Sequence, residues 1–181
     1  MQSASGRELG RIVAAAILVT GGTAAVLRAV DTLPGLLLGE PRGIVRHASV
    51  EAAEKALGTK VLLPAYFPDS LRWPPSSVRS GRVPAPGLGV QFTGRDGGRE
   101  RLFVFETLPD GSEFPTSLVP EASAYHAVPV QVGDAAGVFR SVRMASEGNF
   151  SEIEFRKDGR KILIRYAGTG DELMKIAGSL R

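Results

Sequence analysis

Hydrophobic and polar residues alternate most regularly near the C-terminal end of the chain. Residues 152–156 switch between charged and apolar side chains, Asp158 and Gly159 follow, and residues 162–166 alternate in return. A period of two residues is typical of a strand with one buried face, and an Asp-Gly pair favours the tight turn of a hairpin. The pattern therefore predicts an antiparallel hairpin over residues 152–166.

Shorter apolar runs upstream predict further strands. The run from Leu102 to Phe105 is apolar on both faces, so its strand is expected to be buried on both sides. Pro129 lies within another run and has no amide hydrogen to donate, which places that strand at an edge of the sheet or at a bulge. These signals predict strands at residues 90–92, 102–105, 126–132 and 137–142, with a long loop over residues 109–120.

A helix is predicted on either side of the strands. Ser49 can cap the first helix and Gly58 follows its end, while Thr169 and Glu172 have the spacing of a capping box for the second, which runs to Leu180. Each helix has one apolar stripe that must be buried. The predicted fold class is therefore α+β: a curved antiparallel sheet with a short N-terminal helix and a C-terminal helix packed on one face, and with the other face open.

The segment Leu63–Pro75 contains four prolines and is predicted to be a loop or an edge. It carries three aromatic residues, Tyr66, Phe67 and Trp73. Two interpretations stay open for them: they fold against the sheet, or they present an apolar surface to a ligand.

The N-terminal part differs from the rest. Ile12–Leu27 is a run of sixteen residues without a charge, preceded by Arg11 and followed by Arg28. A bilayer span needs about 20 apolar residues, and the run approaches this length if both arginines snorkel to the headgroups. We interpret it as a single membrane anchor; a cleaved signal peptide and a buried helix of a soluble protein are the alternatives.

This interpretation divides the chain into a tail and membrane anchor at residues 1–30, a linker at residues 31–48 and a folded domain at residues 49–181. A short leading tail usually stays in the cytoplasm, and the chain contains no cysteine. We therefore expect a single-pass protein of the cell membrane whose C-terminal domain is extracytoplasmic.

Composition narrows the chemistry. Of the 181 residues, 43% are hydrophobic and 23% are charged, which fits one folded domain with a short extra segment and excludes a disordered chain. The absence of cysteine excludes disulfide frameworks, iron–sulfur sites and thiol catalysis. A net charge of +3 is too small to indicate a nucleic-acid partner, and none is expected.

No catalytic, cofactor-binding or metal-binding residue is predicted, and we expect a protein that is not an enzyme. The two histidines, His47 and His126, are far apart in the sequence, and no serine lies in a G-x-S-x-G motif. Glu152 and Glu154 are interpreted as cross-strand charge partners of Arg165 on a solvated face, because nothing sets the pKa values of the two carboxylates apart.

Six arginines gather in the Pro-rich loop and the first hairpin, and we interpret them as a solvated rim. Contact with nucleic acid or with anionic lipid headgroups is the alternative, although Asp96 and Glu100 interrupt the cluster. The six are Arg72, Arg79, Arg82, Arg95, Arg99 and Arg101.

Two segments carry a resemblance to a known family. Residues 52–58, AAEKALG, lead into residues 61–68, VLLPAYFP, and the chain closes with GDELMKIAGSL at residues 170–180. Over roughly residues 50–181 the chain resembles a bacterial domain of unknown function found in the extracytoplasmic halves of membrane-anchored anti-sigma factors and related envelope proteins. It is more distantly similar to the half-barrels of periplasmic lipoprotein carriers and their sigma-regulator relatives, which bind acyl chains.

The resemblance implies a helix, a Pro-x-x-x-Pro loop, paired strands and a closing helix, and it implies no catalytic residues. Only some ten residues precede the apolar run, too few for a cytoplasmic sigma-binding domain. A role in signalling therefore requires a partner.

The function that we expect is a membrane-anchored, non-enzymatic envelope domain that binds a partner protein or an envelope ligand. The alternative is a lipid or lipoprotein carrier that uses the open apolar face of the sheet. A lined cavity would favour the carrier, a filled face with an exposed apolar rim would favour the binding domain, and two ionisable groups in one cleft would favour an enzyme. The contact residues expected in the first two cases are Tyr66, Phe67, Trp73, Phe103 and Phe105.

Overall fold

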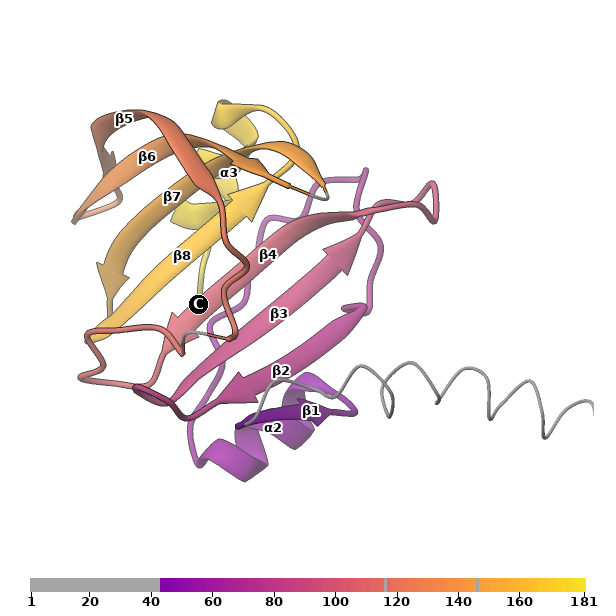
Figure 1. Ribbon diagram of the computed structural model, residues 1–181, viewed down its shortest axis with the longest axis vertical. Coiled ribbons are helices and arrows are strands. Elements are labelled where there is room, and N and C mark those ends of the chain that lie inside the picture. Colours follow the sequence, from indigo (N-terminus) through magenta and orange to yellow (C-terminus); the bar gives the residue numbers. More distant parts are fainter. Residues whose placement is uncertain (1–42, 116, 146) are drawn as a thin grey trace, which may run out of the picture. The chain divides into compact units, whose positions relative to one another are not determined.

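The computed structural model describes residues 43–115, 117–145 and 147–181 (Figure 1). These residues form one compact unit, Gly43–Arg181. The predicted anchor at Ile12–Leu27 lies outside the described residues, as does most of the predicted linker. In the described part of the chain, no helix combines the length and the hydrophobicity that a membrane span requires.

Within the described residues, eight antiparallel strands form one twisted sheet (Figure 1). The strand order is β1-β2-β3-β4-β8-β7-β6-β5, so that β1 and β5 are the two edges and the last strand, β8, pairs with β4 at the centre. The strands are β1 (Ile44–His47), β2 (Ser77–Gly81), β3 (Gly87–Thr93), β4 (Glu100–Thr107), β5 (Ser123–Val132), β6 (Ala135–Met144), β7 (Gly148–Lys157) and β8 (Arg160–Tyr166).

Local signals located most of these strands correctly. The predicted hairpin is β7–β8, and both Asp158 and Gly159 have positive φ, at 50° and 73°, as a primed turn requires. Pro129 lies in β5, an edge strand of ten residues without a charged side chain, as its missing amide hydrogen predicted. β1 and β2 were not predicted, because β1 is short and β2 mixes small, charged and apolar residues. β1 belongs to the folded unit, although the sequence placed its residues in the linker.

Two helices cover one face of the sheet, which confirms the α+β class. The side chain of Ser49 accepts a hydrogen bond from the amide of Ala52 at the start of α2 (Val50–Leu57). Thr169 and Glu172 form the predicted capping box at the start of α3 (Gly170–Gly178). The apolar stripes of both helices join one core with alternate residues of the strands, among them Val50, Ala53, Val90, Leu102, Val104, Ile153, Ile162, Ile164, Leu173 and Ile176.

The opposite face is not open where the sequence predicted an open apolar surface. Phe103 and Phe105 are 0% exposed, because the loop between β4 and β5 folds over them and places Leu118 in a second core on this face. Glycine lets the loop approach: a Cβ on Gly81 would lie 2.6 Å from the Cβ of Pro115. We call residues 109–122 the covering loop.

A row of buried and half-buried charges crosses the same face over β6, β7 and β8. Lys161 forms an ion pair with Glu154 at 3.0 Å. Arg140 forms ion pairs with both Glu154, at 3.0 Å, and Glu152, at 3.1 Å. Arg165 then binds Glu152 at 2.7 Å. The predicted pairing of Glu152 with Arg165 is confirmed, but the prediction of a solvated face is wrong, because both side chains are buried.

The row of charges also holds the covering loop in place, through Arg165. Arg165 also donates to the backbone carbonyl of Pro120, which ties the loop to β8. Burial acts to raise the pKa of Glu154, but hydrogen bonds from Lys161 and Arg140 outweigh it and the pKa is lowered. Lys161 and Arg140 therefore hold the half-buried carboxylate of Glu154 in its ionised form, as a charge removed from water requires.

A second buried ion pair holds the segment that follows α2. Arg160 binds Glu106 at 2.9 Å and also donates to the carbonyl of Lys60 and the hydroxyl of Thr59. The amide of Leu62 donates to both carboxylate oxygens of Glu106 at 3.3 Å. Burial raises the pKa of Glu106 from its usual 4.5 to about 7, although Arg160 and the Leu62 amide favour the ionised form.

This shift predicts a pH-dependent stability. A carboxyl whose pKa is raised in the folded state stabilises the fold fully below pH 4.5, and the contribution is lost as the pH rises through about 7. We expect the melting temperature of the wild-type chain to fall between pH 5 and pH 8 by a few degrees. Glu106→Gln removes this titration and should flatten that part of the profile.

Glu113→Gln, on the exposed covering loop, is the matched control and should keep the wild-type profile. Thermal unfolding followed by circular dichroism at each pH makes the comparison. A Glu106→Gln profile as steep as the wild-type profile would contradict the assignment.

Candidate functional site

The structure separates the five predicted contact residues into two groups. Phe103 and Phe105 lie in the core under the covering loop, whereas Phe67 packs against the core on the helix-covered face. Trp73 is 58% exposed and Tyr66 is 38% exposed. Since the side chains of β4 alternate between the two faces, the phenylalanines and the aromatic loop cannot line one common surface.

Three aromatic rings pack together at the exposed end of this loop. The Trp73 ring stacks on Phe92 with centroids 5.9 Å apart, and Phe67 meets both rings edge-on, at 5.0 Å from Phe92 and 6.1 Å from Trp73. Phe67 thus folds against Phe92 of β3, as one of the two interpretations had it for the loop aromatics. Trp73 rests on them and remains at the surface.

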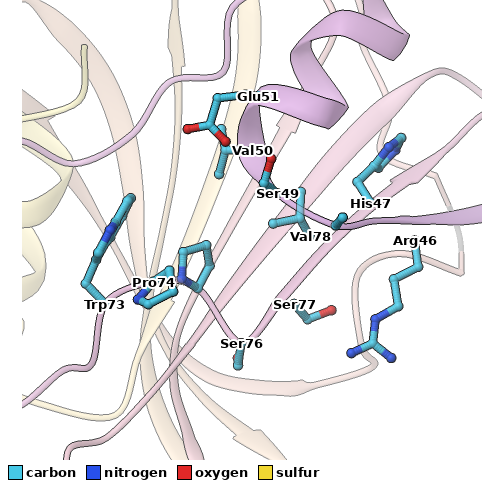
Figure 2. Close-up of a pocket in the computed structure, with 12 residues that line it drawn as sticks. Arg46, His47, Ser49, Val50, Glu51, Trp73, Pro74, Ser76, Ser77 and Val78 are labelled. Atoms are coloured by element: carbon cyan, nitrogen blue, oxygen red, sulfur yellow. The ribbon is translucent and has the colours of Figure 1, made fainter.

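A cavity of about 400 Å³ lies beside Trp73 (Figure 2). It is lined by residues 46–51, where β1 turns into α2, and by residues 73–78, which lead into β2. We call it the corner pocket. In Figure 2, Trp73 and Glu51 stand on one side of the pocket and Arg46 on the other.

The pocket lies where β1 has already ended and the first residue of β2, Ser77, has no partner on that side among the described residues. The ladder between them stops at the pair His47–Val78, where Ser49 caps α2 and turns the chain away. β2 continues to Ser77, which pairs with Gln91 on its other side. Pro74 and Pro75 before it have no amide hydrogens and cannot extend the ladder. The space beside Ser77 is therefore left without a strand.

Several polar groups of the pocket already have partners, and this decides what they can still bind. The hydroxyl of Ser76 donates to the carbonyl of Gln91 at 3.0 Å, which leaves its oxygen as an acceptor. The Ser77 oxygen accepts from Nε of Arg79 at 2.9 Å, which leaves its hydrogen to donate. His47 is engaged with Ser80 at 2.8 Å. The pocket thus offers both a donor and an acceptor.

The charges of the pocket are unequal. A hydrogen bond from Ser49 lowers the pKa of the exposed Glu51, which keeps this carboxylate ionised. Arg46 lies directly opposite Arg79 on the neighbouring strand, and like charges in that position destabilise a sheet. Among the described residues, neither arginine has a carboxylate within 4.0 Å.

The six arginines predicted as a rim are spread over the loop, β2 and the β3–β4 turn. Arg95 donates to the carbonyl of Leu71, and Arg101 lies 4.0 Å from Asp96. Of the six, Arg72, Arg82, Arg95 and Arg99 are exposed, while Arg79 and Arg101 are half-buried.

A second cavity, of about 460 Å³, is lined by three carboxylates, Asp96, Glu100 and Glu147. Glu100 and Glu147 both line it, as do Arg99 and Arg101. Burial raises the pKa of Glu100 and of Glu147, while Arg79 opposes the shift of the first and Arg99 that of the second. A general acid and base need pKa values pushed apart, and here both move the same way. The two pKa shifts therefore do not distinguish Glu100 and Glu147 as a general acid and a general base.

Sequence reasoning missed the corner pocket except for Trp73. The start of α2 and the Pro-rich loop were predicted, but β1 and β2, which bring these two segments together and add Arg46, His47, Ser77 and Val78 to the lining, were not. The signal that was present is the run Trp73–Ser77, in which an aromatic residue, two prolines and two serines follow one another. Across the described residues, no three or more His, Asp or Glu side chains are placed to hold a metal ion.

Comparison with known proteins identifies no relative: no family model, no curated protein and no solved structure matches the chain. The resemblance to the extracytoplasmic halves of anti-sigma factors stays a prediction. The site must therefore be interpreted from its own geometry.

The aromatic group gives a test of which ring supports the fold. Phe92→Ala should lower the free energy of unfolding by about 3–5 kcal/mol, because it empties a buried site. Trp73→Ala should cost only about 1–2 kcal/mol, the scale of its two aromatic contacts. Urea unfolding followed by circular dichroism compares the two. Equal losses would mean that Trp73 serves packing instead of the surface.

Proposed function

We propose that this chain is a non-enzymatic, membrane-anchored domain of the cell envelope that binds a partner protein or an envelope ligand at the corner pocket. The observation that supports this proposal is the exposed Trp73 beside a cavity of mixed polar and apolar lining, on a domain whose central strands are covered on both faces. An exposed aromatic side chain next to a concave polar site is typical of binding surfaces.

The lipid carrier has less support. Its predicted lining requires Phe103 and Phe105 to face an open cavity, and both are fully buried under the covering loop. An acyl chain would have to displace Leu118 and the loop that Arg165 holds through Pro120.

Binding at the pocket can be tested in the native cell by photo-crosslinking. A benzophenone amino acid replaces Ser76, at the rim of the pocket, in the full chain. We expect irradiation to give one discrete adduct, and we expect Trp73→Ala in the same chain to abolish it.

The matched control carries the benzophenone at Ser117, an exposed serine of the covering loop on the opposite face of the sheet. It should give no adduct. Equal labelling from both positions, or no labelling from Ser76, would refute binding at the pocket.

Anchoring rests on the run Ile12–Leu27 and has a test of its own. The full chain should stay in the membrane pellet after extraction with alkaline carbonate, and a variant that lacks residues 12–27 should move to the soluble fraction. Release of the full chain by carbonate would show that the run does not span the bilayer.

A further inference from the structure

The corner pocket has an aromatic wall that suits a ring with one apolar face. Trp73 rests on Phe92, lines the pocket and is 58% exposed in all. The face of an indole ring is electron-rich and attracts polarised C–H groups. A pyranose ring presents such C–H groups on one face and hydroxyl groups around its rim. An aliphatic chain would satisfy the indole but none of the polar groups beside it.

The polar groups of the pocket match the rim of a sugar. Ser76 is left as an acceptor and Ser77 as a donor, and the carboxylate of Glu51 stands on the same side of the pocket as Trp73 (Figure 2). Because each sugar hydroxyl both donates and accepts, the hydroxyls around one ring can donate to Ser76 and Glu51 and accept from Ser77.

The cationic side of the pocket calls for an anion. Arg46 lies opposite Arg79 across β1 and β2. Arg79 already has the carboxylate of Glu100 nearby, whose pKa it acts to lower, so an anion bound at Arg46 would relieve the remaining repulsion between the two arginines. Arg46 lines the pocket on the side opposite Trp73, and Arg79 holds Ser77, which lines it too. A guanidinium group binds a carboxylate through two parallel hydrogen bonds.

We infer that the corner pocket binds an acidic saccharide, with the sugar ring on Trp73 and its carboxylate at Arg46. The inference rests on the proposed binding function and names the class of ligand. The cavity of about 400 Å³ lies within the range of small-ligand pockets, roughly 300–1,000 Å³.

Trp73 is the only tryptophan of the chain, so its fluorescence reports directly on the pocket. The full chain, in detergent micelles, is titrated with tetragalacturonate and with a neutral tetrasaccharide of galactose, which differs in lacking the carboxylates. We expect saturable quenching by the acidic saccharide, with at least about tenfold weaker binding of the neutral one.

Two variants test the assigned contact. Arg46→Gln should weaken binding of tetragalacturonate by about tenfold or more, because it removes the charged donor. Arg143→Gln, an exposed arginine on β6 away from the pocket, should leave it unchanged. Circular dichroism confirms that both variants fold.

The remaining outcomes overturn the inference. It fails if the neutral saccharide binds equally well, if Arg46→Gln binds like the wild type, or if none of the saccharides quenches. It also fails if polyglutamate or adenosine monophosphate competes at the same concentration, because the pocket would then recognise charge or a nucleotide instead of a sugar. A crosslinked protein partner at Ser76 combined with no saccharide binding would retain the proposed function and refute only this ligand class.

Discussion

The fold depends on the burial of β4 on both of its faces. Leu102 and Val104 point into the core under the helices, and Phe103 and Phe105 point into the core under the covering loop. A strand at the centre of an antiparallel sheet can leave one face in water when polar and apolar residues alternate. The run Leu102–Phe105 is apolar at every position, so both faces of this strand must be buried. The chain therefore needs a helix layer on one side and a loop layer on the other.

The two layers determine where charge is tolerated. The covering loop lies over β8, where Arg165 and its partner Glu152 are buried, and every carboxylate in that row has a cation within 3.1 Å. On the helix side, Glu106 and Arg160 play the same part and hold the chain that leaves α2. Buried pairs of this kind contribute little net stability, but breaking one partner is costly, so they favour a single arrangement of the loops.

The same layers leave one corner for recognition. The central strands are covered on both faces, and the corner pocket with its exposed tryptophan lies at the edge of the sheet, where β1 departs from β2. The pocket is a product of topology: a four-residue strand stops pairing because a helix cap turns the chain, while its neighbour continues.

Sequence reasoning succeeded where a few neighbouring residues decide the outcome. The Asp158-Gly159 turn, the caps at Ser49 and Thr169 and the position of Pro129 at an edge all follow from local backbone chemistry, and the structure confirms them. It failed where contacts between distant segments decide.

The solvated charge face, the open apolar face and the absence of β1 and β2 were all errors of this second kind. Each of these features depends on which distant segment packs against a given strand, and the alternation of polar and apolar residues within the strand does not indicate its partner. The candidate site falls in the same class: Trp73 is visible in the sequence, but Arg46 joins it only after eight strands have paired.

Pro129 has one consequence for the molecule in a crowded solution. In the described part of the chain β5 is a ten-residue edge strand without Asp, Glu, Lys or Arg, which is the kind of edge that templates growth from one molecule to the next. A proline near its middle leaves an arriving chain without an amide hydrogen to bond there, and neighbouring copies are denied a continuous row of contacts. The sheet is thus capped against fibrous stacking by a missing hydrogen atom instead of by electrostatic repulsion.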